Sequence, residues 1–249
     1  MTTLQAFKLF IRRLLKPLGI KAKKPEEAPS NSDFQRDYIQ SVLKKIRAGK
    51  HHASLGANIS EKSKSSAFST FKHLASLLSS KADVVVDYGC GTLRIGKHFI
   101  EYLLPHKYVG MDIHPEILQA GIKTINGNLI HEKNPVLLTI NTENLRNTSK
   151  LLPSLIFSKG VLQHVPPSGI EEFFANISII ANTGTLILVR AKSATETKRI
   201  SEKSWTHSRA DIERAASKSN LILAEVINGW HRFSFKMAAN TSSAPSHQI

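Results

Sequence analysis

The stretch ADVVVDYGCGTLRIGKHFI, residues 82–100, decides the fold predicted for this chain. A short apolar run ends at Asp87, glycines follow at positions 89 and 91, and a helical pattern begins soon after. Glycine at a strand–helix turn allows a sharp bend and lets a ligand approach the backbone closely. The stretch therefore predicts a buried strand, a ligand-binding turn and a helix.

Apolar runs and helical patterns alternate after this turn. Further strands are predicted at YVGMDI (108–113), VLLTI (136–140), LIFSKG (155–160), TLILVRA (185–191), LILAEVI (221–227) and WHRFSFKMA (230–238). Helices are predicted near 94–104, from Pro115, near 168–181 and near 209–219. This alternation of strands rich in Val, Ile and Leu with helices indicates an α/β fold, a mostly parallel sheet with helices on both faces.

The last two apolar runs are joined by Asn228-Gly229 alone, which predicts a tight hairpin and an antiparallel pair of strands. Before them, the polar stretch KSATETKRISEKSWTHS (192–208) follows the fifth predicted strand. Its position favours a lid over an acceptor site, and its polarity equally fits an ordinary loop. Both interpretations stay open.

The composition limits the possible classes of protein. The chain has 249 residues, a single cysteine and a formal net charge of +15. One cysteine excludes an intramolecular disulfide framework and a cysteine-rich zinc site. Because no run of about 18 apolar residues occurs, the sequence also predicts no membrane span.

Much of the positive charge lies in residues 1–24, which contain no acid. Residues 1–20 predict an amphipathic helix with an apolar stripe and Lys8, Arg12 and Lys16 on another face. Such a helix favours contact with an anionic membrane surface. A transit peptide, a nucleic-acid contact and a helix packed on its own domain fit the same pattern.

The remaining chain divides by composition. Residues 21–32 predict a linker, residues 33–80 a helical cap region, residues 81–239 the main domain and residues 240–249 a disordered tail. Within the cap region, helices are expected at 34–47, with Asp33 as N-cap, and at 65–78. No internal repeat is found.

The turn after the first strand does not fit a dinucleotide. The G-x-G-x-x-G pattern from Gly89 would need glycine at position 94, where the chain has Arg94. An acid, Asp87, precedes the glycines, and a carboxylate beside a helix N-terminus suits an ammonium group better than a phosphate. S-adenosylmethionine has an ammonium group, a ribose and no phosphate, so it is the ligand predicted here.

With these stretches, the chain resembles the class I S-adenosylmethionine-dependent methyltransferases over residues 65–238. VVVDYGCGTLRIG is similar to their first motif, with Leu93 in place of the usual third glycine. YVGMDIHPEIL resembles the second motif, TINTENL the adenine-contacting motif, and LIFSKGVLQHVPPSGIEEFFANI with GTLILV the fourth and fifth strands and the helix between them. The resemblance implies a Rossmann-like seven-stranded sheet in the order 3-2-1-4-5-7-6, with the last strand antiparallel.

The resemblance also implies roles for individual residues. Asp112 would hydrogen-bond both ribose hydroxyls, Asn141 would reach the exocyclic amine of adenine, and the Thr142 backbone would meet the ring. Cys90 is interpreted as a small space-filling residue of the turn. The implied cofactor-binding set is Asp87, Gly89, Cys90, Gly91, Asp112, Ile113, Asn141, Thr142 and Ser158.

The candidate catalytic residue is His164, just after the fourth strand, where it would serve as general base for a hydroxyl acceptor. A loop-fixing hydrogen bond is the alternative role. The [DN]-PP-[YFW] motif that holds flat nitrogen acceptors is absent, since Ser158 to Val161 occupy its place. No metal site is predicted.

The function predicted from the sequence is therefore methyl transfer from S-adenosylmethionine to a hydroxyl or carboxyl group. The predicted acceptor is a glycan, a lipid-linked sugar or a small metabolite. The predicted location is the cytoplasm, with contact at the inner face of a membrane through residues 1–20; an organellar location also fits. Two alternatives stay open: an RNA methyltransferase whose basic N-terminus binds phosphates, and a non-catalytic binding protein of the same fold.

Overall fold

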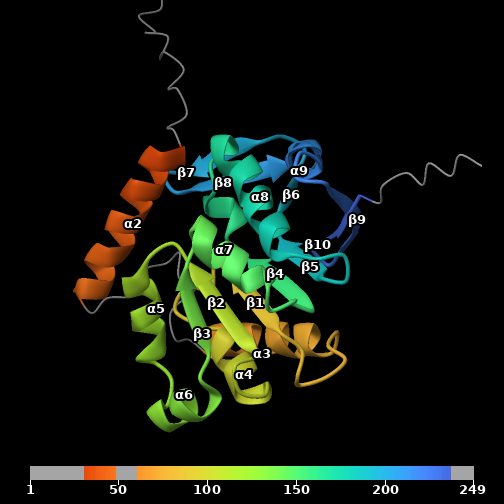
Figure 1. Cartoon of the computed structure of the whole chain (residues 1–249). Helices are drawn as coiled ribbons and strands as arrows, with labels where there is room; N and C mark the ends of the chain where they lie inside the picture. Colours follow the sequence, from red (N-terminus) through yellow and green to blue (C-terminus); the bar gives the residue numbers. More distant parts are fainter. Residues whose placement is uncertain (1–30, 49–60, 237–249) are drawn as a thin grey trace, which may run out of the picture.

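The computed structural model describes residues 31–48 and 61–236 (Figure 1). Seven strands form the central sheet: β1 (Val85–Tyr88), β2 (Tyr108–Asp112), β3 (Val136–Thr139), β4 (Leu155–Lys159), β5 (Leu186–Arg190), β9 (Leu221–Ile227) and β10 (Trp230–Phe235). Their order is β3-β2-β1-β4-β5-β10-β9, and β10 is antiparallel to both of its neighbours. The predicted sheet, with its strand order and antiparallel last strand, is confirmed.

Helices cover both faces of this sheet, as predicted. One face carries α3 (Glu61–Ala75), α4 (Gly96–Tyr102), α5 (Pro115–Ile122) and α6 (Gly127–Lys133). The other face carries α7 (Thr142–Ser149), α8 (Ile170–Ile180) and α9 (Arg209–Ser217). We call these the α4 face and the α8 face.

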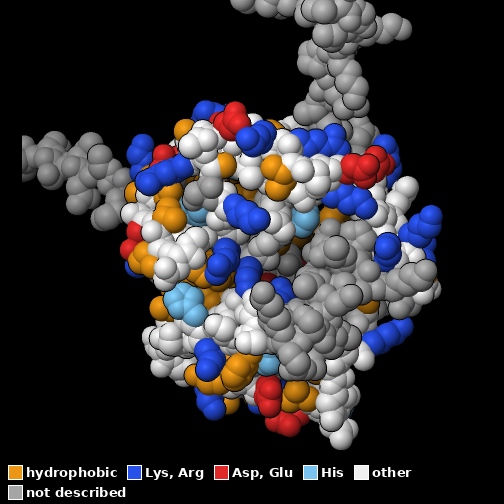
Figure 2. All heavy atoms as spheres, turned by 180° about the vertical axis from the view of Figure 1, so that it is seen from behind, with side chains coloured by type: hydrophobic (Ala, Val, Ile, Leu, Met, Phe, Trp, Pro, Cys, Tyr) orange, Lys and Arg blue, Asp and Glu red, His pale blue; other side chains and the backbone are white. Residues whose placement is uncertain are grey.

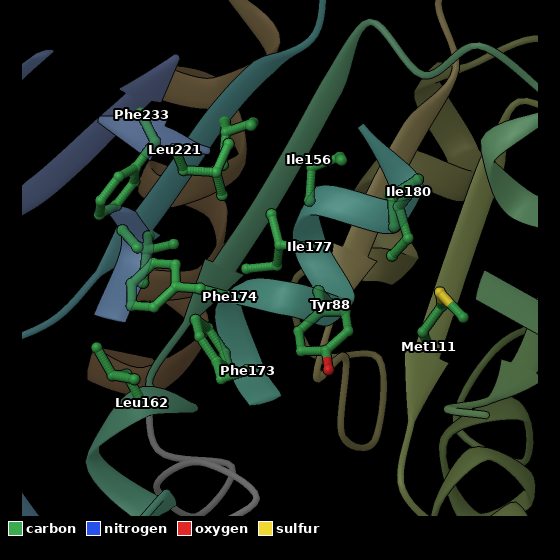
Figure 3. Packing of buried hydrophobic residues seen from close by; sticks show 14 of the residues in the cluster. Tyr88, Met111, Ile156, Leu162, Phe173, Phe174, Ile177, Ile180, Leu221 and Phe233 are labelled. Carbon is green, nitrogen blue, oxygen red and sulfur yellow. The ribbon is translucent and has the colours of Figure 1, made fainter. Parts of the chain in front are cut away.

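The core lies on both faces of the sheet, because its strands carry apolar side chains on both sides. In β1, Val85 packs on the α4 face and Val86 on the α8 face, and both side chains are fully buried. Figure 3 shows part of the cluster on the α8 face, where Phe174 and Ile177 of α8 pack with Ile156 of β4. Because β1 lies between β2 and β4, its carboxyl end and the turn that follows it lie near the middle of the sheet edge.

The hairpin prediction is also confirmed. Asn228 and Gly229 connect β9 to β10 with φ angles of 51° and 78°. Two successive positive φ angles match the right-handed twist of the flanking strands, and Asn-Gly is the pair that adopts them at least cost. This turn places β10 between β5 and β9.

The N-terminal predictions are met only in part. Helix α2 (Asn31–Arg47) begins at Asn31, inside the stretch predicted as linker, so Asp33 lies within the helix and not at its N-cap. The predicted helix in residues 1–20 and the tail at 240–249 lie outside the described residues. The N-terminal helical region of the prediction corresponds, where described, to α2 and α3.

Three features were not predicted, and one of them is helix α6, which follows α5. Helix α7 follows β3 directly, in a stretch with no strong apolar periodicity. The polar stretch after β5 forms a second sheet from β6 (Ser193–Ala194), β7 (Lys198–Ser201) and β8 (Ser204–Ser208), in the order β6-β8-β7. We call this small sheet the insert.

Candidate functional site

The turn between β1 and α4 is built on two glycines with positive φ. Gly89 has φ of +81° and Gly91 has φ of +55°, a region that side chains disfavour. A Cβ on Gly89 would lie 2.2 Å from Cγ2 of Val161, which follows β4. Only glycine therefore fits at position 89, and the turn lies directly against the loop after β4.

Leu93 occupies the place where a third glycine is usual in this motif. Its φ is 59°, and its side chain is fully buried on the α4 face. A left-handed conformation costs a leucine about 1–2 kcal/mol, less than the stabilisation from burying its side chain. The turn thus keeps its path without the third glycine.

Asp112 ties the turn to the end of β2. Its Oδ2 accepts a hydrogen bond from the Gly91 amide at 2.7 Å, and its Oδ1 accepts one from the Ile113 amide at 2.8 Å. Burial raises the pKa of Asp112 to about 6, while these two hydrogen bonds lower it. Each carboxylate oxygen has a further lone pair, so Asp112 can accept two more hydrogen bonds.

A cavity of about 230 Å³ opens beside this turn, just below the ~300–1,000 Å³ typical of small-molecule sites. Gly89, Gly91, Asp112 and Ile113 line one part of it. The part toward the loop after β4 includes Lys159 and His164, and α2 contributes Gln35, Tyr38 and Ile39. The cavity therefore joins the glycine turn to the candidate base under a covering helix.

His164 lies in the short helix η3 (Leu162–His164) after β4. Its Nδ1 is 2.7 Å from the carbonyl oxygen of Lys203 in the insert. Since a carbonyl only accepts, Nδ1 carries the proton and Nε2 has the free lone pair. Burial lowers the pKa of His164, so the ring is neutral at neutral pH. Its accepting Nε2 faces the side-chain amide of Gln163 at 3.1 Å.

The insert fixes this loop from a second direction. Nε2 of the buried His207, in β8, donates to the carbonyl oxygens of Leu162 and Val165, both at 3.0 Å. Lys203 also donates its Nζ to the Ser41 hydroxyl of α2. The insert therefore orients His164 and contacts the covering helix.

Helix α2 packs over the cavity through a small apolar cluster. Val42 and Leu43 are buried against Ile117 of α5. Arg47 forms an exposed ion pair with Glu116 at the end of the helix. The ring of Tyr38 lies 5.4 Å from the ring of His164, tilted by 33°.

Comparison with solved structures identifies the fold. Magnesium protoporphyrin IX methyltransferase (ChlM) from Synechocystis PCC 6803, solved with bound S-adenosylmethionine, matches with a TM-score of 0.56 and 15% identity, over 84% of this chain and 97% of that chain. The mitomycin 7-O-methyltransferase MmcR matches with a TM-score of 0.52 and 12% identity, over 81% and 68%. No family model and no curated protein matches the sequence.

The chain has the class I methyltransferase fold. At these identities the likeness concerns the arrangement of helices and strands alone. The glycine turn, Asp112 and the cavity lie at the carboxyl ends of the parallel strands, where ligands bind in open α/β sheets. Of the predicted site residues, the cavity of this methyltransferase fold brings together Gly89, Gly91, Asp112, Ile113 and His164.

Asp87 is not brought to the cavity wall. Its side chain is buried on the α4 face, where Oδ2 accepts a hydrogen bond from the Tyr108 hydroxyl at 3.0 Å. Burial raises the pKa of Asp87 to about 7, and the Tyr108 hydrogen bond lowers it. Its alternation in β1, opposite to Tyr88, directs it behind the turn rather than into the cavity.

Four other predicted residues lie beside the cavity without lining it. Cys90 is buried, and burial raises the pKa of its thiol well above its usual value, which fits a space-filling role. Asn141 caps α7, with Oδ1 accepting from the Asn144 amide at 2.9 Å, and Thr142 is the exposed first residue of that helix. Ser158 is buried in β4.

Sequence reasoning missed several residues of the cavity wall. Tyr38 comes from α2, and Tyr88, Phe173 and Asn176 come from β1 and α8. Asn176 donates to the Tyr88 hydroxyl at 3.1 Å. Lys159 did carry a signal, because a lysine at the end of an otherwise buried strand is unusual.

Two further findings concern the described residues only. Among them, no group of three or more His, Cys, Asp or Glu side chains is placed to hold a metal ion. Their helices include none that combines the length and the apolar composition needed to cross a bilayer.

Proposed function

We propose that this protein is an S-adenosylmethionine-dependent methyltransferase whose acceptor is a hydroxyl or carboxyl group of a glycan, a lipid-linked sugar or a small metabolite. One observation carries the proposal: a single cavity joins the glycine turn and Asp112 to a neutral histidine. A cofactor bound at the turn and an acceptor beside His164 would then share one cavity.

The residues present fit this cofactor. Gly89 and Gly91 line the cavity at the turn, so a ligand can lie against the backbone there. Asp112 is held in place by Gly91 and Ile113 and keeps a lone pair on each oxygen for the two ribose hydroxyls. Ile113 and Ile140 would provide the apolar walls for a flat ring.

The protein's own contribution to the reaction would be alignment and proton removal. When bound, S-adenosylmethionine supplies an activated methyl group on a sulfonium. His164 would accept the proton of a hydroxyl acceptor at Nε2, replacing the contact with Gln163. The Lys203 carbonyl would stabilise the resulting positive ring through Nδ1. A carboxylate acceptor needs no base, and His164 would then only shape the cavity.

For location, the proposal is a cytoplasmic protein that contacts the inner face of a membrane through the basic residues 1–20. The charge of the N-terminal segment, free of acids, supports this part. The same charge supports the rival function, an RNA methyltransferase. An RNA methyltransferase would bind RNA in a salt-sensitive manner, and this binding would disappear when residues 1–24 are deleted.

The deciding experiment uses S-adenosylmethionine labelled in its methyl group. The protein is incubated with cell extract, which is then separated into RNA, lipid-plus-glycan, protein and small-molecule fractions. Label in the lipid-plus-glycan or small-molecule fraction supports the proposal, whereas label in nuclease-sensitive material supports the RNA rival. Calorimetric titration with S-adenosylhomocysteine covers the second rival, because a non-catalytic relative that binds no cofactor would give no heat.

A further inference from the structure

Two cations lie side by side at the carboxyl edge of the sheet. Lys159 ends β4 and Arg190 ends β5, and the two residues are direct partners in the parallel register. Both side chains project to the α4 face, because they follow the alternation of Phe157 and Leu188. We call these two residues the cationic row.

Among the described residues, the contacts of Lys159 and Arg190 include no carboxylate that would neutralise the row. Lys159 donates to the hydroxyl of Thr70 in α3, and the Arg190 guanidinium lies 5.7 Å from the centre of the Trp230 ring. Within the described ranges, no carboxylate lies within ion-pair distance of Lys159 or Arg190.

This arrangement costs stability in the absence of a ligand. Like charges at directly opposed positions of neighbouring strands repel each other. Burial, together with the charges of Arg94 and Arg190, lowers the pKa of Lys159 to about 8. An anion placed between the two side chains would remove the repulsion and favour the protonated lysine. The row therefore has the properties of an anion site.

Lys159 connects the row to the proposed active site. Lys159 lines the same cavity as Gly89 and His164. Figure 2 shows Lys and Arg side chains gathered near the middle of the face opposite to that of Figure 1, beside a hollow in the surface. An acceptor in the cavity could thus extend one end toward the row.

We propose that Lys159 and Arg190 form a subsite for an oxyanion group, a carboxylate or a phosphate, carried by a small-molecule or glycan acceptor. The inference rests on the proposed function, since it names the class of acceptor for that site. The anionic group is the handle by which the acceptor is held, and the atom that receives the methyl group lies nearer to His164. The methylated product therefore keeps its negative charge.

The first test measures the subsite without any acceptor. Protein saturated with S-adenosylhomocysteine is treated with an amine-acetylating reagent, with and without inorganic phosphate, and acetylation of Lys159 is followed by peptide mass spectrometry. We expect phosphate to slow this acetylation at least about threefold, since it binds beside the amine. Equal acetylation rates at all phosphate concentrations would overturn the inference.

Two arginine variants make the test specific. Arg190→Gln should remove most of the phosphate protection. Arg232→Gln is the matched control, because Arg232 lies on the same sheet face, opposite Leu188, but pairs with Glu225. We expect it to keep the protection. If both variants or neither lost it, the protection would not come from the row, and the inference would fail.

The second test examines the labelled product from the extract reaction. Product formed by the wild-type protein should bind an anion exchanger and should fall at least about fivefold with Arg190→Gln, but not with Arg232→Gln. A neutral product contradicts the inference. Retained label that nuclease releases would contradict the small-molecule or glycan class and favour RNA.

Failure of the proposed function gives a different result. If S-adenosylhomocysteine does not bind, the methyltransferase proposal fails. Phosphate protection of Lys159, measured also without S-adenosylhomocysteine, then still decides whether the row binds an oxyanion. If S-adenosylhomocysteine binds and protection is absent, only the subsite inference is overturned.

Discussion

At the scale of single residues, the two buried acids beside the glycine turn, Asp87 and Asp112, differ in what they face. Asp112 lines the cavity, with each oxygen held by one backbone amide. Asp87 lies behind the turn and accepts a hydrogen bond from the hydroxyl of Tyr108. The first is therefore placed to bind a ligand, and the second is placed to respond to pH.

Replacing Asp112 tests the ligand role. We expect Asp112→Ala to weaken the affinity for S-adenosylhomocysteine at least about tenfold, because two charge-assisted hydrogen bonds to the ribose are lost. Calorimetric titration measures the affinity, and Glu143→Ala, which removes an exposed acid of α7, is the control. Unchanged affinity in a folded Asp112→Ala protein would show that the carboxylate only holds the turn.

Asp87 should make the stability of the unliganded protein depend on pH. Because its pKa is raised to about 7 in the folded state, from about 3.9 when unfolded, the folded state holds this proton more tightly. The free energy of unfolding should therefore fall by about 2–3 kcal/mol between about pH 5 and about pH 8 from this group. Urea unfolding at both pH values should show a smaller fall in Asp87→Asn. An equal fall in both proteins would contradict the assignment.

The role of His164 as general base is tested separately, by kinetics. We expect His164→Gln to lower kcat by about 10²- to 10⁴-fold and to leave the affinity for S-adenosylhomocysteine unchanged. In the wild-type protein, kcat should rise with pH through a pKa below about 6.5, because burial lowers the pKa of His164 and only the neutral ring accepts a proton. If kcat and its pH profile are the same in the variant, His164 only fixes the loop.

At the scale of elements, α2 is the part of the cavity wall that the sheet does not support. It is held by Val42 and Leu43 against α5 and by the Arg47–Glu116 pair. Burial of apolar side chains contributes more than an exposed ion pair, which is worth about 0–1 kcal/mol. The apolar cluster should therefore decide whether α2 covers the cavity.

Two substitutions in α2 separate these contributions. Val42→Asp should detach the helix, raise the KM for the acceptor and increase amide hydrogen exchange in residues 31–47, while the central sheet keeps its protection. Arg47→Ala should change neither the KM for the acceptor nor the hydrogen exchange of residues 31–47 by more than about twofold. Hydrogen exchange measured by mass spectrometry gives the comparison. Loss of protection throughout the sheet in Val42→Asp would mean that α2 is part of the main folding unit.

Helix α7 and the insert, which sequence analysis missed, share a physical cause. In α7, only Leu145 and Thr148 are buried, and Thr, Asn and Ser are weak helix formers, so no apolar stripe marks the helix. Its cap, Asn141, was the available signal. The strands of the insert are short and polar, and their pairing depends on distant parts of the same segment. By contrast, β1 and the Asn228-Gly229 turn are encoded locally and were predicted.

The residues of the candidate site likewise divide into those that could be predicted from the sequence and those that could not. Gly89, Gly91 and Asp112 could be found because their spacing follows from one strand–turn–helix unit and the strand beside it. Tyr38 and Asn176 could not, since they reach the cavity through the packing of whole helices. The side of β1 that Asp87 faces could be inferred only with the strand in its sheet. Local chemistry was therefore predictable, and the composition of the cavity wall was not.

At the scale of the whole molecule, the excess of positive charge is the property that remains to be explained. The chain has a net charge of +15, and residues 1–24 contain no acid. Residues 1–24 combine positive charge with apolar side chains at helical spacing. Binding to an anionic lipid surface uses both features, whereas binding to nucleic acid uses the charge alone.

Deleting residues 1–24 should reduce co-sedimentation with phosphatidylglycerol liposomes at least about tenfold and leave the weak binding to phosphatidylcholine unchanged. A full-length variant with Phe7, Ile11 and Leu14 changed to Ser keeps every charge. We expect it to lose most of the liposome binding as well, because the apolar face is gone. Equal co-sedimentation of the truncated and full-length proteins would remove the membrane proposal.

The contact between Lys203 and His164 has a consequence for how this protein can vary. The histidine is oriented by a main-chain carbonyl, so no particular side chain is needed at position 203 for that purpose. What must be kept is the length and path of the insert, which bring the carbonyl to the ring. Related chains could therefore differ at every exposed position of β7 and still hold the histidine in the same tautomer. A deletion of one or two residues there would misplace the carbonyl, although it would remove no side chain of the cavity wall.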